Sequence, residues 1–158
     1  MRLEIDGRYS NIKFSACHFI AGHARCGKLH GHVYVIQMVL YGEKGDNGMV
    51  MDFIDLKQTL RRIVEDFDHK VLLPGNSSRV HLYRSEKEVE AKIDGKRYVF
   101  PIEDVLVLDI SESSAEEIAE AMLDRILEEL EITPNIQRIE VGVDEERGQS
   151  AWASRDLR

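Results

Sequence analysis

The sequence is poor in cysteine, with two in 158 residues, and this bears on the compartment and on the source of stability. The first ten residues lack the apolar stretch of a secretory signal, so Cys17 and Cys26 are interpreted as thiols rather than as a disulfide framework. A chain of this length buries a core that needs no crosslinks. We therefore expect a single domain over residues 1–158, in the reducing cytoplasm.

Long apolar runs and an excess of positive charge are also missing. No apolar run approaches the roughly 20 residues needed to cross a bilayer, so no segment is expected to span a membrane. The formal net charge is −8, whereas nucleic-acid binding needs lysine and arginine clustered on one face. The sequence shows no glycine-rich phosphate loop, internal repeat or linker. A small-molecule ligand is therefore expected, with no nucleic acid and no membrane as partner.

The first half of the sequence predicts two strands and a helix. Apolar residues alternate with polar ones over residues 8–19, and Val, Ile and Tyr dominate residues 30–42, so both segments are predicted strands. The basic, glycine-containing stretch between them indicates a loop. From Asp52, a good N-cap, to Phe67, apolar residues recur at spacings of three and four, which predicts a helix.

The second half predicts a hairpin, a strand, a helix and a last strand. Asp94-Gly95 joins two alternating runs, at 89–93 and 97–100, and is a strong hairpin signal. Another strand is predicted over 105–110, and a capping box of Ser114 and Glu117 predicts the start of the second helix. The final predicted strand begins at Ile136. Strands grouped around two helices indicate an α+β layer architecture.

Three histidines form the pattern that carries the most chemistry. Residues two apart in a strand point to the same side, so His30 and His32 present two imidazoles on one face, with Gly31 between them. If the two opening strands pair antiparallel, His18 at the end of the first lies beside this pair. Three histidine ligands with one open position describe a catalytic zinc site. The alternative is a set of partly buried histidines that hydrogen bonds satisfy.

Two further patterns are candidates for proton transfer. Cys26 lies on the predicted loop, where Arg25 and Lys28 favour the thiolate, the form that acts as base or nucleophile. The same cysteine is also readable as a small buried residue or as a fourth zinc ligand. Asp68 directly precedes His69, and a carboxylate beside a histidine fixes its tautomer for proton transfer. The end of a helix is equally an ordinary surface position for such a pair.

The last predicted strand ends in three carboxylates, which belong to Asp144, Glu145 and Glu146. Taken alone, this cluster is a solvated charged turn. A buried carboxylate that accepts two N–H donors is, however, a natural partner of an amino-pyrimidinone ring, as in pterins and guanine. One of these carboxylates is therefore a candidate for binding such a ring.

Four segments of the chain stand out together: FSACH at 14–18, CGKLHGH at 26–32, GMVMDFIDLK at 48–57, and the Asp-His pair at 68–69. In this order they resemble one enzyme family, the 6-pyruvoyl-tetrahydropterin synthase and 6-carboxytetrahydropterin synthase family. The resemblance covers the first half of the chain closely. It implies that zinc is bound by His18, His30 and His32. It implies further that protons are moved by Cys26 and by the pair of Asp68 and His69.

The resemblance also implies a fold and an assembly. Members of this family have the tunnelling fold, in which each subunit contributes a four-stranded antiparallel sheet with two helices on one face. Subunits close into a barrel with active sites at their interfaces. A homo-oligomer is therefore expected, and a homohexamer is the expected form.

The second half departs from the family's pattern in three places. The family usually reads Pro-Thr-x-Glu before its second helix, where this chain reads SSAE at 113–116 and keeps a cap. The family ends its last strand in Glu-Thr, and here the phase of the strand favours Glu145 as the pterin-binding carboxylate, with Asp144 as the alternative. The segment 76–110 is longer than the usual connection, and it is predicted to contain an added β-hairpin.

The function that the resemblance implies is zinc-dependent chemistry on 7,8-dihydroneopterin triphosphate. The spacing Cys-x-x-x-His-Gly-His resembles the 6-carboxy-5,6,7,8-tetrahydropterin synthases, which release acetaldehyde and triphosphate in the 7-deazaguanine pathway to queuosine and archaeosine. The alternatives are a 6-pyruvoyl-tetrahydropterin synthase, a dihydroneopterin aldolase-like lyase, and a zinc-containing pterin-binding protein without catalysis. Candidate triphosphate contacts are Lys13, Arg25 and Lys28.

Overall fold

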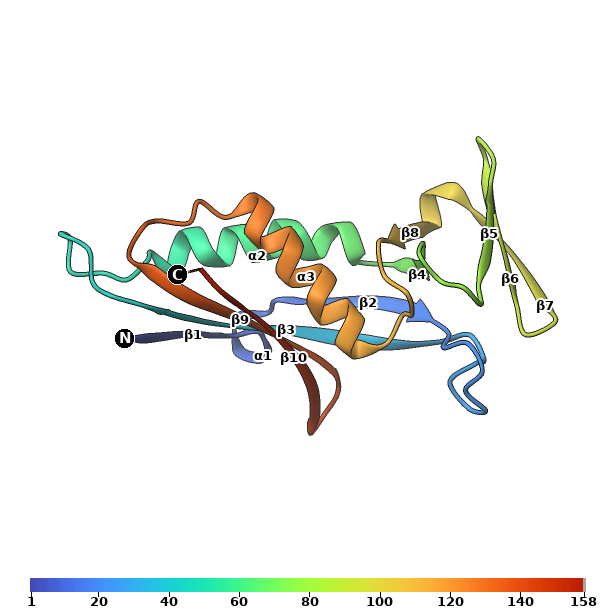
Figure 1. Cartoon of the computed structure of the whole chain (residues 1–158), viewed down its shortest axis with the longest axis horizontal. Helices are drawn as coiled ribbons and strands as arrows, with labels where there is room; N and C mark the ends of the chain where they lie inside the picture. The colour runs from blue at the N-terminus through green and yellow to red at the C-terminus, as the bar shows by residue number, and fades with distance from the viewer. Residues whose placement is uncertain (158) are drawn as a thin grey trace.

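The computed structural model describes residues 1–157 and shows an α+β fold in which two long helices cover one face of a large mixed sheet (Figure 1). The elements in chain order are β1 (Arg2–Asp6), α1 (Gly7–Ser10), β2 (Lys13–His18), β3 (His30–Gly42), α2 (Phe53–Phe67), β4 (Lys70–Pro74), β5 (His81–Arg84), β6 (Glu88–Ile93), β7 (Lys96–Pro101), the 3-10 helix η1 (Ile102–Asp104), β8 (Val105–Leu108), α3 (Ala115–Glu129), β9 (Ile136–Glu146) and β10 (Gln149–Asp156). Within residues 1–157, no helix has both the length and the apolar character needed to cross a membrane.

The main sheet is larger than the four antiparallel strands that the sequence predicted. Six of its seven strands run in the order β10-β9-β3-β2-β4-β8, and the seventh, β1, pairs with the C-terminal half of β3. The pairs that involve β3 and β9 are antiparallel, whereas β2, β4 and β8 are parallel to one another. The parallel part follows from the chain's route, because a crossover through β5–β7 separates β4 from β8.

The predicted strand at 8–19 is wrong at its first half. The chain instead leaves β1 through the short helix α1, which Asp6 caps by accepting a hydrogen bond from the Arg8 N–H at 2.9 Å. Asn11 then adopts a left-handed conformation with φ of 53°, which asparagine tolerates better than most residues. Gly7 lies against the Ile36 carbonyl, where a Cβ atom would approach to 2.0 Å, so the turn needs glycine at this position.

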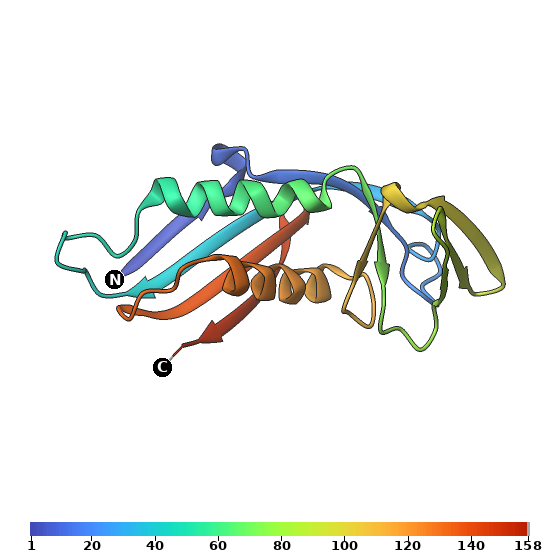
Figure 2. The same ribbon diagram turned by 90° about the horizontal axis from the view of Figure 1, so that it is seen from above.

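Both predicted long helices are confirmed, and each begins at the expected cap. The Asp52 carboxylate accepts a hydrogen bond from the Ile54 N–H at 2.7 Å, and the Ser114 hydroxyl accepts one from the Glu117 N–H at 3.4 Å. The capping box is only half formed, because the Glu117 carboxylate accepts hydrogen bonds from Ser111 rather than from the Ser114 N–H. Figure 2 shows the two helices side by side over the sheet, where they cover the main core.

Replacing Asp52 with alanine tests the cap of α2. The Ile54 N–H would lose its acceptor at a helix end, where no backbone carbonyl replaces it. We expect a loss of about 1 kcal/mol in the free energy of unfolding, measured by urea titration. Gln58→Ala, at an exposed position inside the same helix, is the control. Equal stability of the two variants would contradict the assigned cap.

The segment predicted as an added hairpin at 76–110 is a separate three-stranded antiparallel sheet, β5-β6-β7. The Asp94-Gly95 turn joins β6 to β7 as predicted, with positive φ at both residues. The segment's last strand, β8, belongs to the main sheet instead, where it pairs with β4. A second buried apolar cluster lies between the small sheet and the main one, and it includes Phe19 and Val71.

Candidate functional site

The pairing of β2 with β3 brings the three predicted histidines together. His18 lies directly opposite His30, and Ala16 lies opposite His32, so all three imidazoles are on one face of the sheet. One ring nitrogen from each histidine lies within 4.8 Å of the others. His18 is fully buried, and the other two are partly buried at the start of β3. This geometry is that of a possible three-histidine metal site.

The hydrogen bonds of the rings leave nitrogens free to bind a metal. Nδ1 of His18 lies 2.5 Å from the Ser113 carbonyl, and Nδ1 of His30 lies 2.7 Å from the Lys28 carbonyl. A carbonyl only accepts, so each Nδ1 carries the hydrogen and each Nε2 presents a lone pair. Nε2 of His18 and Nε2 of His32 are buried without a hydrogen-bond partner. Histidines that serve only as satisfied core residues do not leave such atoms.

The charge state of His18 also suits metal binding. Burial, opposed in part by the Ser113 carbonyl and helped by the neighbouring histidines, lowers the pKa of His18 to about 4. The imidazole is therefore neutral near pH 7, and the neutral form is the one that donates a lone pair to a metal. The donor set, its free Nε2 atoms and its charge state all fit a zinc ion.

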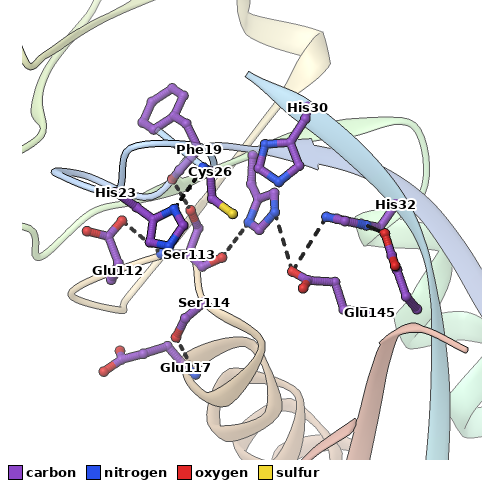
Figure 3. A network of polar contacts seen from close by, with 12 residues as sticks. Phe19, His23, Cys26, His30, His32, Glu112, Ser113, Ser114, Glu117 and Glu145 are labelled. Carbon is purple, nitrogen blue, oxygen red and sulfur yellow. Dashed lines mark hydrogen bonds and ion pairs between the residues drawn. The ribbon is translucent and has the colours of Figure 1, made fainter. Parts of the chain in front are cut away.

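The two carboxylates considered at the end of β9 face opposite sides of the sheet. An oxygen of Glu145 lies 3.4 Å from Nε2 of His18 and 3.7 Å from Nε2 of His32 (Figure 3). Asp144 is buried and instead accepts a hydrogen bond from the Gln37 amide at 2.6 Å. Strand alternation accounts for this difference. Glu145 is thus the carboxylate on the face of the histidines.

A small pocket beside Glu145 contains a second carboxylate, which the sequence interpretation missed. This pocket has a volume of about 210 Å³ and lies where the start of α3 meets β9 and β10; its lining includes Glu145, Glu116, Ser114 and Gln149. Sequence reasoning treated Glu116 only as part of a helix start. The sequence signal for Glu116 was its position two residues after the helix cap. Its proximity to Glu145, however, depends on how α3 packs on the sheet. Together the two carboxylates offer several acceptors to a ligand rich in N–H donors.

Cys26 lies on the loop at 19–29, beside the histidines. Its sulfur is turned toward the cluster, and its backbone N–H donates to Nδ1 of His23 at 2.8 Å (Figure 3). The side chain is half-buried. His23, which the sequence left without a role, therefore shapes the loop through a local hydrogen bond.

The Asp68-His69 pair is fixed at the end of α2, against β2. One oxygen of Asp68 accepts a hydrogen bond from the Ser15 N–H at 2.8 Å, and the other lies 2.8 Å from Nδ1 of His69. The hydrogen bond from the Ser15 N–H is the main reason that the pKa of Asp68 lies below its ordinary value, and the contact with His69 lowers this pKa further. His69 has a left-handed backbone with φ of 59°, a strained conformation of the kind that clusters at functional sites.

The pair is exposed and stands apart from the other candidates. The side chain of His69 is 83% exposed, and among the polar contacts within residues 1–157 none joins it to Cys26 or to the three histidines. His69 and His32 do line one open depression of about 580 Å³. The candidate phosphate contacts Lys13, Arg25 and Lys28 are all exposed.

Comparison with known proteins adds relatives over the whole chain. A sequence profile of the family described as 6-pyruvoyl tetrahydropterin synthase matches residues 9–156. A protein of Methanocaldococcus jannaschii, provisionally named a 6-carboxy-5,6,7,8-tetrahydropterin synthase, is 37% identical over 96% of this chain and 94% of its own length. A relative in Aquifex aeolicus with the same enzyme name is 32% identical over 50% of this chain and 47% of its own.

Solved structures show the same architecture. The 6-pyruvoyltetrahydropterin synthase of Plasmodium vivax, also solved as catalytic-residue mutants, superposes with a TM-score of 0.92 at 28% identity, covering 99% of this chain and 98% of its own. The Caenorhabditis elegans enzyme shares the fold, with a TM-score of 0.60 at 16% identity, covering 100% of this chain and 96% of its own. The predicted tunnelling fold is therefore confirmed, and with a profile match over nearly the whole sequence, this chain belongs to the 6-pyruvoyl tetrahydropterin synthase family.

Proposed function

We propose that this protein is a zinc-dependent 6-carboxy-5,6,7,8-tetrahydropterin synthase. It would convert 7,8-dihydroneopterin triphosphate and one water into 6-carboxytetrahydropterin, acetaldehyde and triphosphate, a step toward 7-deazaguanine compounds. The observation that carries the proposal is the cluster of three imidazoles with two buried, unpartnered Nε2 atoms beside a cysteine. The names of the relatives in Methanocaldococcus jannaschii and Aquifex aeolicus support this branch of the family.

The metal would be held by Nε2 atoms of the cluster, with His18, His30 and His32 as ligands. Zinc bound with three protein ligands keeps one position open and acts as a Lewis acid on substrate oxygens. The carbonyls of Ser113 and Lys28 orient the rings, because each accepts the Nδ1 hydrogen of one ligand. The Ser113 carbonyl lies just before α3, and the Lys28 carbonyl lies on the loop at 19–29 that carries Cys26.

The pterin ring would bind through its amino-pyrimidinone edge. Glu145 is our candidate for the carboxylate that accepts these N–H donors, and Glu116 lies in the same pocket to accept more. A ring held there would direct its C6 side chain toward the histidines, because Glu145 is adjacent to both His18 and His32. Charge-assisted hydrogen bonds of this kind fix the ring's orientation as well as adding affinity.

Two groups would transfer protons, namely the Cys26 thiol and the pair of Asp68 and His69. The sulfur of Cys26 faces the cluster and would take a proton from the substrate's side chain. In the pair, Asp68 lies at Nδ1 of His69, so that nitrogen carries the hydrogen and Nε2 is free to accept or deliver a proton. Asp68 is held in turn by the Ser15 N–H, so the orientation of the imidazole is fixed by β2.

We propose further that the site is completed at a subunit interface. His69 is exposed, its backbone is strained, and it has no polar contact with the histidine cluster of its own chain within the described residues. An acid/base pair in that position would serve a site formed with a second copy of the chain. The expected assembly is a homohexamer, in which each copy lends its Asp68 and His69 to a neighbour.

A 6-pyruvoyl-tetrahydropterin synthase is the second candidate. The close superposition on the Plasmodium vivax enzyme favours it, because the superposition covers 99% of this chain and 98% of that enzyme's chain. That reaction would eliminate triphosphate and retain the carbon side chain. The two candidates therefore differ in whether a carbon–carbon bond breaks.

Product analysis tests the proposal directly. Zinc-loaded protein is incubated with 7,8-dihydroneopterin triphosphate and, separately, with 7,8-dihydroneopterin, and products are identified by mass spectrometry. We expect acetaldehyde and 6-carboxytetrahydropterin, and no turnover after chelation of the metal, because the substrate oxygens would then lack their Lewis acid. A pyruvoyl pterin would assign the second candidate, and cleavage of dihydroneopterin alone would assign an aldolase-like lyase. Tight pterin binding without any product would indicate a non-catalytic binding protein.

A further inference from the structure

The loop that carries Cys26 is closed by its own hydrogen bonds. The Ile20 N–H donates to the Cys26 carbonyl at 2.8 Å, and the Gly27 N–H donates to the His23 carbonyl at 2.8 Å. The Cys26 N–H donates to Nδ1 of His23, as described above. We expect a loop joined in this way to move as a unit. Contacts from outside the loop therefore decide where the thiol lies.

The turn between β6 and β7 contacts this loop on both sides of the cysteine. A carboxylate oxygen of Asp94, in the turn, accepts a hydrogen bond from the Gly22 N–H at 2.7 Å. Nζ of Lys96, the first residue of β7, donates to the Gly27 carbonyl at 3.0 Å. One contact precedes Cys26 in the chain, and the other involves the residue directly after it. Both are charge-assisted hydrogen bonds, which are stronger than neutral ones.

Apolar packing supports the same arrangement. The Phe19 ring stacks on the Tyr98 ring of β7, with centroids 5.5 Å apart and planes 21° apart. Phe19 and Ala21, at the start of the loop, are buried in one cluster with Val89 and Ile93 of β6. Figures 1 and 2 both show the loop and the small sheet together at one end of the molecule. The loop therefore packs on this sheet rather than lying free in solvent.

The backbone at these contacts leaves little freedom. Gly22 has φ of 73°, and the Arg79 guanidinium fills the space where a Cβ atom would lie, at 1.8 Å. The same guanidinium is 3.9 Å from the Asp94 carboxylate. Asp94 itself has φ of 48°, a conformation that few residues other than glycine, asparagine and aspartate adopt. The carboxylate is thus presented to Gly22 by a defined turn.

We infer that Asp94 and Lys96 are positioning residues for Cys26, and that the β6–β7 turn holds the thiol toward the histidine cluster. Neither residue touches the reacting atoms, so both act through the loop. The inference rests on the proposed function for its effect on turnover. Its effect on the loop and on the thiol is independent of the reaction. The small sheet would then be part of the catalytic apparatus rather than a surface addition.

The test replaces Lys96 with methionine, which keeps the apolar stem and removes the donor. Lys92→Met is the matched control, because Lys92 lies in the same small sheet but contacts Glu90 and the Tyr83 ring instead of the loop. Amide exchange of residues 20–27 should rise on the order of tenfold in Lys96→Met and stay unchanged in Lys92→Met, because only the first variant loses a charged hydrogen bond to the loop. Alkylation of Cys26, followed by mass spectrometry, should accelerate in the same variant.

Steady-state kinetics provide a third measurement of the same variants. In Lys96→Met, kcat should fall about tenfold or more, with KM and zinc content unchanged, because a misplaced acid/base group slows the chemical step without weakening binding. Lys96→Arg, which keeps a donor, should restore most of the turnover. Asp94→Gly, which removes the carboxylate and accepts the positive φ, should loosen the loop in the same way. This second variant decides the matter if Lys96→Met does not fold.

The possible results separate this inference from the proposed function. Exchange and alkylation that are equal in Lys96→Met, Asp94→Gly and the Lys92→Met control would overturn the positioning role, whatever the enzyme's product. If the wild-type protein made no product while the loop responded to both variants as expected, the proposed function would fail and the positioning role would stand. A general loss of melting temperature with unchanged loop exchange would show that the contacts serve stability alone and would also overturn it.

Discussion

Replacing His32 with alanine should weaken zinc binding by more than about 100-fold and abolish turnover. Zinc held by four protein ligands contributes roughly 10–16 kcal/mol, so each ligand carries about 3 kcal/mol, or more than two factors of ten. His32 is the suitable ligand to remove, because its side chain is partly exposed, whereas His18 is fully buried and its loss would also leave a core cavity. Competition with a chromophoric chelator measures the dissociation constant.

The control for this experiment is His81→Ala, at an exposed position of β5 in the small sheet. It removes an imidazole from the chain without touching the cluster, so zinc affinity should stay at the wild-type value. Thermal unfolding of both variants checks that the fold persists, since the main core does not include His32. A His32→Ala protein that still binds one zinc per chain with wild-type affinity would refute the three-histidine site.

Local signals predicted the elements that carry the site. Strand β3 and helix α2 begin and end where the apolar period and the cap at Asp52 placed them. Strands β1 and β10 were not predicted, because most of their residues are polar or exposed and they are strands only through pairing with β3 and β9. Gly142 of β9 reflects the pairing with β10, since a Cβ atom there would lie 2.6 Å from the Trp152 ring of β10.

The site likewise contains residues that local sequence patterns predict and residues whose placement depends on long-range packing. The histidine cluster was predictable because strand alternation places His30 and His32 on one face and the hairpin-like pairing adds His18. The neighbourhood of Glu116 to Glu145 depends on how α3 packs against β9 and β10, and no local pattern encodes that packing. The contacts of the β6–β7 turn with the cysteine loop join residues about 70 positions apart, for which a single sequence offers no periodicity to read.

Cys26→Ala and His69→Ala should each lower kcat by about 10²–10⁴-fold while keeping zinc, because general acid–base groups contribute on that scale. Neither residue is among the zinc ligands proposed here, so metal content separates a lost proton carrier from a lost cofactor. Cys17→Ala is the control, since the Cys17 thiol lies on the opposite face of β2 and contacts the Lys70 carbonyl at 3.9 Å. It should retain turnover close to the wild-type value.

Coexpression of the two inactive variants distinguishes a shared site from one within a single chain. If each site takes its cysteine from one copy and its histidine from a neighbour, random mixing leaves about a quarter of the sites with both wild-type residues. Turnover should then return to about that fraction of the wild-type rate. If Cys26 and His69 serve the same site from one chain, every site in the mixture lacks one group and activity stays at the level of the single variants. The exposure of His69, at 83%, and its strained backbone make the first outcome the expected one, because a free chain gives that imidazole no partner except Asp68 within the described residues.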